Sequence, residues 1–315
     1  MRGPVQLLLV VLALAATAAA CGGGDDVRGA SRPAAAPLPG DGRPTVRLGT
    51  KNFTEQYVLG ELYAQALRAQ GYTVELKSDI GATEVTHRAL TSGSIDLYPE
   101  YTGTILGVIA GDTRLPRTGA ATYRRAQTFE QGNDLTLLDR TPFEDRDAIA
   151  VAESYARRND LRTISDLRPL GTRVTVGGSP EFRARYQGYR GLRDVYRLDA
   201  RYTSLPIGQV YPGLRDGTIQ AGSAFTTDGE LASDDLRLLA DDRALFGSQH
   251  LAPLVRDAVL ERQGPDFART LDRVSARLTT PVMQRLNARA GADDGDPAAV
   301  ARAFLRSQDL LRPLR

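Results

Sequence analysis

Residues 45–62 read TVRLGTKNFTEQYVLGEL, and the spacing of the apolar side chains changes within this stretch. Val46 and Leu48 alternate with polar neighbours, which predicts a short β-strand. Asn52 is followed three residues later by Glu55, a spacing typical of a capping box at the start of a helix. The apolar residues that follow recur at helical spacing as far as the glycine at position 71. We therefore expect a strand that leads directly into an amphipathic helix.

The same alternation of strands and helices continues along the chain. Short apolar runs predict strands at 72–76, 95–98, 148–152, 173–176 and 220–225. Amphipathic spacing predicts helices at 83–90, at 102–110, near 164–167 and through the C-terminal third. This alternation is typical of βαβ units with a parallel sheet, so the expected fold class is α/β. Two such blocks indicate two lobes around a cleft, one from residues 45–146 plus 226–315 and the other from residues 147–225.

The N-terminus predicts export. Residues 1–20 carry a basic residue, then an apolar run and then small residues, which is the order found in a signal peptide. The apolar run is shorter than the roughly 20 residues that a membrane-spanning helix needs. Cys21 is the only cysteine and follows three alanines, which resembles a bacterial lipobox with alanine where leucine is usual. We expect Cys21 to be lipidated and residues 21–44 to form a flexible tether; the alternative is an ordinary secretory signal with an incidental cysteine.

The composition and the motifs argue against several classes of function. Forty basic residues stand against 38 acidic ones, and no basic stripe with interleaved aromatic residues is present, so we expect no nucleic-acid binding. The chain has only two histidines and lacks metal-ligand spacing, a phosphate-binding loop and a nucleophile motif. We therefore expect no catalytic residue, no metal site and no cofactor, and the chain is not predicted to be an enzyme.

Several motifs follow one another in an order that resembles a known family. The first is Gly49–Leu59, GTKNFTEQYVL, and the second is Gly93–Leu106, GSIDLYPEYTGTIL. Further matches are the segment from Glu181 to Leu192, Gly208–Leu214 (GQVYPGL), Thr226–Glu230 (TTDGE) and the segment from Asp241 to Val255. From about Val46 to the C-terminus, the chain is similar to the glycine betaine/choline/carnitine binding proteins of osmoprotectant ABC importers.

This resemblance implies a two-lobed, type II periplasmic-binding architecture whose lobes close around a small solute. The implied partners are ABC permease subunits, and the implied form is a monomer held outside the cytoplasm at the membrane. A trimethylammonium group has no N–H to donate, so the family holds it against the faces of aromatic rings by cation–π attraction.

The resemblance also implies which residues bind the ligand. Tyr101, Tyr211 and Phe225 fall at positions of the aromatic cage, and Thr104 falls at a ligand-contacting position. A further binding residue, Gln56 or Tyr57, is expected at the start of the first helix. Two positions depart from the family pattern because Thr141 and Gln249 stand where tyrosines are frequent.

These departures leave the ligand open. The first hypothesis is a quaternary ammonium compound, the second is a different small polar solute on the same scaffold, and the third is an exported enzyme or a surface adhesion lipoprotein. Tyr98 is interpreted as a core residue because it lies within a predicted strand. Arg185 is expected to pair with Glu181 rather than with the ligand.

Overall fold

The computed structural model describes residues 36–116, 118–292 and 294–314, so the predicted signal peptide and Cys21 lie outside the described residues. Within this part of the chain, the strands form two five-stranded sheets. The first sheet has the order β2 (Val74–Lys77), β1 (Val46–Gly49), β3 (Leu97–Tyr101), β10 (Leu251–Arg256), β4 (Leu135–Leu137). The second has the order β7 (Arg201–Ser204), β6 (Thr175–Gly178), β8 (Ala221–Phe225), β5 (Asp147–Ala152), β9 (Leu236–Leu239).

Both sheets are mixed, whereas the sequence pattern predicted parallel strands. β1 pairs in parallel with β2 and β3, and β6 pairs in parallel with β7 and β8. β10 in the first sheet and β5 in the second are antiparallel to both of their neighbours. The difference arises because β5 and β10 each enter their sheet directly from the other one, without a crossover helix that would turn the strand parallel.

The chain crosses between the sheets in two segments, 138–146 and 240–250, which we call the hinge segments. They run antiparallel to each other, with a β-bridge between Glu144 and His250 and a hydrogen bond of 2.9 Å from the Asp145 amide to the Gln249 carbonyl. The sequence pattern predicted that the chain returns to the first lobe at residue 226 and stays there to its end. β9 does not fit that division, because it pairs with β5 and so belongs to the second sheet.

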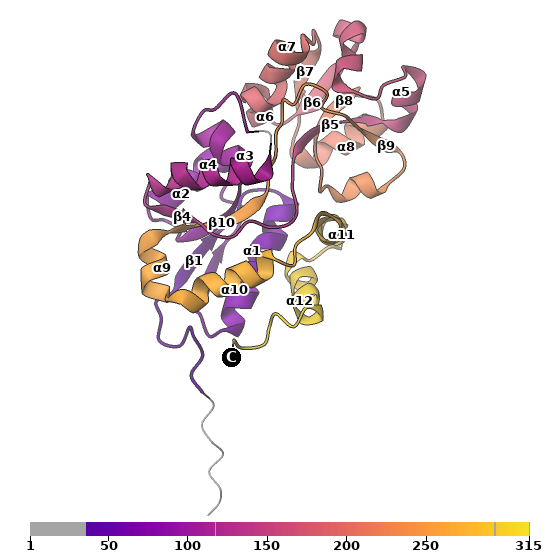
Figure 1. Ribbon diagram of the computed structural model, residues 1–315. Coiled ribbons are helices and arrows are strands. Elements are labelled where there is room, and N and C mark those ends of the chain that lie inside the picture. Colours follow the sequence, from indigo (N-terminus) through magenta and orange to yellow (C-terminus); the bar gives the residue numbers. More distant parts are fainter. Residues whose placement is uncertain (1–35, 117, 293, 315) are drawn as a thin grey trace, which may run out of the picture. The chain divides into compact units, whose positions relative to one another are not determined.

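Helices pack on both faces of each sheet (Figure 1). The helices of the first lobe are α1 (Thr54–Ala69), α2 (Thr83–Thr91), α3 (Thr102–Thr104) with the π-helical turn η1 (Ile105–Ile109), α4 (Gly119–Gln131), α9 (Asp257–Gln263), α10 (Pro265–Ser275), α11 (Thr280–Ala290) and α12 (Pro297–Ser307). Those of the second lobe are α5 (Glu153–Arg158), η2 (Ile164–Arg173), α6 (Pro180–Ala184), η3 (Tyr186–Arg190), α7 (Gly191–Tyr196), η4 (Ile207–Gln209), α8 (Val210–Arg215) and η5 (Gly229–Ala232).

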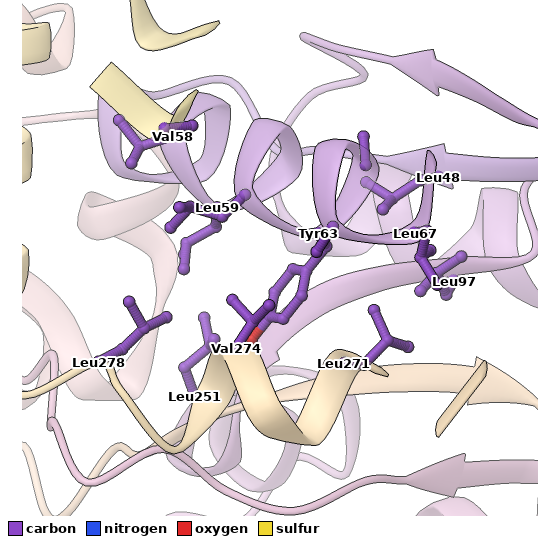
Figure 2. Close-up of a cluster of buried hydrophobic side chains, with 14 of the residues drawn as sticks. Leu48, Val58, Leu59, Tyr63, Leu67, Leu97, Leu251, Leu271, Val274 and Leu278 are labelled. Atoms are coloured by element: carbon purple, nitrogen blue, oxygen red, sulfur yellow. The ribbon is translucent and has the colours of Figure 1, made fainter. Parts of the chain in front are cut away.

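The largest core lies between α1, the first sheet and the C-terminal helices. Leu59 and Leu67 on α1 face Leu271 and Val274 on α10, as Figure 2 shows. Tyr63 is fully buried among them, and its hydroxyl shares a hydrogen bond of 2.9 Å with the Ser275 hydroxyl. This satisfied polar group lets a tyrosine sit in an otherwise apolar core, and the C-terminal helices thereby hold α1 in place beneath the site.

The first helix begins where the sequence predicts but not in the predicted way. Its N-cap is Phe53, without a side-chain cap, so the expected capping box of Asn52 and Glu55 is wrong. The Glu55 carboxylate instead accepts hydrogen bonds from Tyr101 and Asn287. The predicted stop at Gly71 is confirmed, since this glycine has the positive φ of 86° that a chain leaving a helix often needs.

The end of the predicted tether is part of the fold. Residues 39–42 form a turn, and the Gly40 amide donates a hydrogen bond of 2.8 Å to the Gln70 carbonyl at the end of α1. A Cβ at position 40 would lie 2.2 Å from the Tyr72 amide nitrogen, so only glycine allows this contact. Over the described residues, no helix combines the length and the apolar character required to cross a bilayer.

Candidate functional site

A cleft of about 540 Å³ is lined by residues from both lobes. Its walls are the segments that follow the carboxyl ends of β1, β3, β6, β7 and β8, together with residues of the hinge segments and of α11. Open α/β sheets bind ligands at this edge because the connecting loops leave a crevice there. The cleft therefore lies where the sequence placed the ligand.

Aromatic rings from both lobes gather in the cleft. Phe53 stacks on Phe225 with ring centroids 5.8 Å apart and planes inclined by 11°, and on Tyr101 at 6.4 Å and 22°. The other aromatic residues that line the cleft are Tyr57, Phe182 and Tyr211. We call Phe53, Tyr101 and Phe225 the ring stack. Aromatic ring faces attract cations.

One face of Tyr101 already carries a cation. The Lys51 ammonium lies 4.4 Å from the centre of that ring and 5.6 Å from the centre of Phe53. Its charge is matched by Glu100 at 2.6 Å, and Thr83 gives it a further contact at 3.2 Å. Lys51 and Glu100 are both buried, and burial is the main cause that lowers the pKa of Lys51. A ligand cation must therefore use ring faces that Lys51 leaves open.

The structure brings most of the predicted site residues together. Those that line the cleft are Tyr57, Tyr101, Thr104, Tyr211, Phe225 and Gln249. Thr104 and Gln249 act as a pair, since the threonine hydroxyl donates to Gln249 Oε1 at 2.7 Å. Gln249 in turn donates to the Asp147 carboxylate at 2.6 Å, and this fixes the orientation of its amide.

Gln56 and Thr141 lie behind the cleft wall instead of on it. The Gln56 amide donates to the Pro99 carbonyl at 3.0 Å and to the Tyr101 hydroxyl at 3.3 Å, so it supports Tyr101 from behind. The Thr141 hydroxyl bonds to the carbonyls of Phe143 and Leu251 at 3.1 and 3.2 Å. Of the two alternatives at the helix start, the geometry favours Tyr57 as the residue that reaches the cleft.

Six acidic side chains line the cleft without a salt-bridge partner among the described residues, and the pKa is raised for four of them. We call Glu55, Asp145, Asp147 and Asp228 the carboxyl cluster. Hydrogen bonds connect its members to the cleft floor. Tyr101 and Asn287 donate to Glu55 at 2.7 and 2.6 Å, and the Thr227 hydroxyl donates to Asp145 at 2.8 Å. The Tyr211 hydroxyl and the Phe225 amide both donate to Asp228.

Burial raises the pKa of every member of the carboxyl cluster. For Asp228, burial outweighs the bonds from Tyr211 and Phe225 and raises the pKa to about 7. For Asp145, burial together with the charges of Glu55 and Asp228 raises the pKa well above its usual range. With a pKa of about 7, the Asp228 carboxyl is partly protonated near neutral pH, so a cation bound beside it could displace that proton.

The sequence reasoning missed Phe53 and the carboxyl cluster. The position of Phe53 could have been predicted from the sequence. It follows the carboxyl end of β1, just as Tyr101 stands at the carboxyl end of β3. No sequence pattern could have identified the acidic residues. They come from α1, a hinge segment, β5 and the turn after β8, and only the fold brings them together. Arg185 was also misplaced, since it pairs with Glu84 of the first lobe at 3.0 Å and not with Glu181.

Two α/β lobes, joined by two hinge segments around a cleft of aromatic and acidic residues, define this chain as a substrate-binding protein. A family model described as the substrate binding domain of ABC-type glycine betaine transport systems matches residues 44–307. The chain belongs to this family. The family consists of substrate-binding proteins of transporters, which bind small solutes and interact with permeases, and its members are not enzymes.

Individual relatives agree with this assignment. The chain is 34% identical over 281 residues to a glycine-betaine-binding protein of Pseudomonas aeruginosa, covering 85% of this chain and 89% of the relative. It is 26% identical over 276 residues to a carnitine transport binding protein of Listeria monocytogenes, covering 86% of this chain and 89% of the relative. Both alignments extend over most of the chain, so the likeness is not confined to the site.

Solved structures show the same fold. The crystal structure of a glycine betaine/carnitine/choline ABC transporter superposes with a TM-score of 0.69 at 24% identity, covering 84% of this chain and 99% of that one. An unliganded binding protein from Escherichia coli gives a TM-score of 0.61 at 26% identity, with the same coverage. The architecture is therefore the type II periplasmic-binding fold that the sequence predicted.

Proposed function

We propose that this protein captures a quaternary ammonium compatible solute, such as glycine betaine, choline or carnitine, and delivers it to the permease of an ABC importer. The observation that carries this proposal is the ring stack of Phe53, Tyr101 and Phe225 beside unpaired carboxyl groups. Ring faces attract a cation that cannot donate hydrogen bonds, and a low-dielectric cleft strengthens that attraction. The relatives named for glycine betaine and carnitine support the same class of ligand.

Capture proceeds by lobe closure. The ring stack takes Phe53 and Tyr101 from the first lobe and Phe225 from the second. A solute that touches both lobes stabilises the closed form relative to the open form, because its contacts are complete only when the lobes meet. The hinge segments provide the two connections about which the lobes turn. No covalent step is part of this mechanism.

A serine, a glutamate and a histidine lie together among the described residues, but they do not form a catalytic triad. The Ser248 hydroxyl donates to Glu144 at 2.5 Å, and Glu144 lies 3.0 Å from Nε2 of His250. The other ring nitrogen of His250 faces the carbonyls of Thr141 and Phe143. Both side chains contact the same Glu144 oxygen, and no hydrogen bond joins the Ser248 hydroxyl to the His250 ring, so the two are not arranged as a nucleophile and its general base.

Titration calorimetry with the purified protein tests the proposed function. Glycine betaine, choline and carnitine form one set of ligands, and proline and glutamate form the control set because they lack a quaternary nitrogen. We expect saturable binding within the first set only. If no quaternary compound binds and another polar solute does, the scaffold serves a different ligand and the proposal is wrong.

We also propose that the protein is held at the outer face of the cell membrane as a monomer, through a lipid on Cys21. The order of signal residues, alanines and cysteine in the sequence supports this proposal. The test compares the full chain with Cys21→Ser in cells fed an alkyne-labelled fatty acid. The wild type should carry the label and sediment with membranes, and the variant should do neither; an unlabelled, soluble wild type would exclude the anchor.

A further inference from the structure

The hinge contains a histidine whose two ring nitrogens both face hydrogen-bond acceptors. His250 is the last residue of the second hinge segment and is 8% exposed. Its Nδ1 lies 2.9 Å from the Thr141 carbonyl and 3.0 Å from the Phe143 carbonyl. Its Nε2 lies 3.0 Å from the Glu144 carboxylate. All three acceptors belong to the first hinge segment, so the ring joins the two segments about which the lobes turn.

These contacts are complete only when both ring nitrogens carry a proton. A neutral imidazole has one N–H donor, whereas the imidazolium has two. The carbonyls can only accept, so Nδ1 must donate to them. The Glu144 carboxylate can only accept as well, because the hydrogen bond with His250 is the main cause that lowers the pKa of Glu144 to about 2 and keeps it ionised at neutral pH. The geometry therefore matches the charged ring.

The start of α4 covers the ring. A Cβ at Gly119 would lie 2.3 Å from Nε2 of His250, so glycine is what lets the helix approach this closely. The first turn of α4, residues 119–122, has no charged side chain. Two further groups contact the Glu144 carboxylate, namely the Ser248 hydroxyl, which donates to it, and Arg146 at 3.5 Å. The pair of His250 and Glu144 is thus enclosed by both hinge segments and α4.

The other acids of this region are directed to other partners. Asp145 accepts a hydrogen bond from the Thr227 hydroxyl at 2.8 Å, and Asp147 accepts one from the Gln249 amide at 2.6 Å. Loss of one ring proton would leave a lone pair of His250 facing an acceptor, either the carboxylate at 3.0 Å or a carbonyl at 2.9 Å. Two acceptors held face to face away from water are costly, so the ring would have to leave one of its contacts.

We infer that His250 is a protonation-dependent clamp of the hinge. With both ring protons it ties the two hinge segments together, and loss of one proton releases part of that contact and lets the lobes turn more freely. Histidine is the side chain whose charge normally changes between about pH 5 and 8. The hinge is therefore stiffer in acid than above neutral pH. The inference rests on the lobe closure in the proposed function and adds a control to it, but its test needs no ligand.

Amide exchange in the ligand-free protein tests the clamp. The Thr141 amide donates to the Leu251 carbonyl at 2.8 Å, and the Asp145 amide donates to the Gln249 carbonyl at 2.9 Å. Both bonds join the hinge segments beside the ring. After correction for the intrinsic effect of pH on exchange, NMR should show their protection falling roughly fivefold between about pH 5 and 8, the effect of one net hydrogen bond. The Val46 amide, in β1 of the first sheet, should keep its protection.

Three variants separate the clamp from a merely structural role. His250→Gln removes the titrating ring, so the pH dependence of hinge protection should disappear. Glu144→Gln should also remove it, because the new amide can donate to a neutral ring nitrogen where the carboxylate cannot. His87→Gln is the matched control and should keep the wild-type profile. This second histidine is also 8% exposed, but it pairs with Glu130 at 3.2 Å within the first lobe.

The outcomes are distinct from those of the ligand-binding test. Hinge protection that does not change with pH in the wild type would overturn the inference, and so would a wild-type profile in His250→Gln. If His250→Gln does not fold, the ring signals of the wild type, assigned with the help of His87→Gln, decide the question. Protection must then fall over the same pH range in which His250 loses its proton, and any other range overturns the clamp. Failure to bind a solute would contradict the proposed function and leave this result unaffected.

Discussion

Replacing Phe225 by leucine gives the sharpest test of the ring stack. Phe225 has no polar atom in its side chain, and its ring lies parallel to Phe53 at 5.8 Å. Leucine keeps much of the apolar volume and removes only the π-face. A cation–π contact shielded from water is worth about 2 kcal/mol. Since 1.4 kcal/mol corresponds to a tenfold change in affinity, we expect the dissociation constant of a quaternary ammonium ligand to rise roughly 30-fold.

The assay compares a charged ligand with a neutral one of the same shape. Choline and 3,3-dimethylbutan-1-ol differ in that a carbon replaces the nitrogen, so only choline has a cation to place against the ring. Calorimetry should show a large affinity gap between them in the wild type and a smaller gap in Phe225→Leu. Phe304→Leu is the matched control, because Phe304 packs against the core of the first lobe and does not line the cleft.

Stability must be followed at the same time, because core substitutions of this size cost up to about 1.5 kcal/mol. Thermal unfolding without ligand should show similar small losses for Phe225→Leu and Phe304→Leu. Less than a threefold change in choline affinity, or an equal loss for choline and the neutral alcohol, would refute the assignment of Phe225 to a cation site.

Four further predictions concern the carboxyl cluster, the cleft rim and the core. Because the pKa of Asp228 is raised to about 7, its carboxyl is protonated below that pH, and a cation must displace the proton. Cation affinity should therefore increase from pH 5.5 to 8, and calorimetry in buffers of different ionisation heat would measure the proton release. An affinity that does not change with pH would contradict this prediction. The same raised pKa means that Asp228 lowers the stability of the ligand-free protein as pH rises from about 4 to 7, so the ligand-induced shift in unfolding temperature should be larger at pH 8. Glu84→Gln removes the ion pair with Arg185 across the rim and should speed ligand release several-fold in stopped-flow while changing stability by less than about 1 kcal/mol; unchanged release would show that the pair does not restrain opening. Leu271→Ala, in the core between α1 and α10, should cost about 2–5 kcal/mol in the free energy of unfolding and leave ligand affinity unchanged, as denaturant titration and calorimetry would show.

Local sequence patterns predicted most of the strands and helices. The strand at Val46 and the end of α1 at Gly71 follow from spacing and from one glycine, so they could be predicted. The sheet to which β9 belongs could not be predicted. Its partner β5 lies more than 80 residues earlier, and the alternation of strands and helices does not show which strands pair. Parallel strands were expected from the alternation, but strand direction in β5 and β10 depends on where the hinge segments enter the sheets.

The site was predictable where it consists of single residues at strand ends. Tyr101 and Phe225 end β3 and β8, so their place near a cleft follows from the sheet topology. Gln56 lies one residue from Tyr57 on α1, and neighbouring helix positions point in different directions; only the structure shows which of them reaches the cleft. The carboxyl cluster depends on contacts between distant segments, such as Asn287 with Glu55, which no spacing in the sequence predicts.

The hinge segments link solute binding to a movement of the lobes that can be measured. Asp145 and Gln249, which line the cleft, are also joined by a backbone hydrogen bond where the two segments run side by side. Any solute that engages these side chains therefore acts on the backbone about which the lobes turn. A fluorophore attached to an exposed position on each lobe would convert that turn into a change in energy transfer, so the protein could report the solute optically.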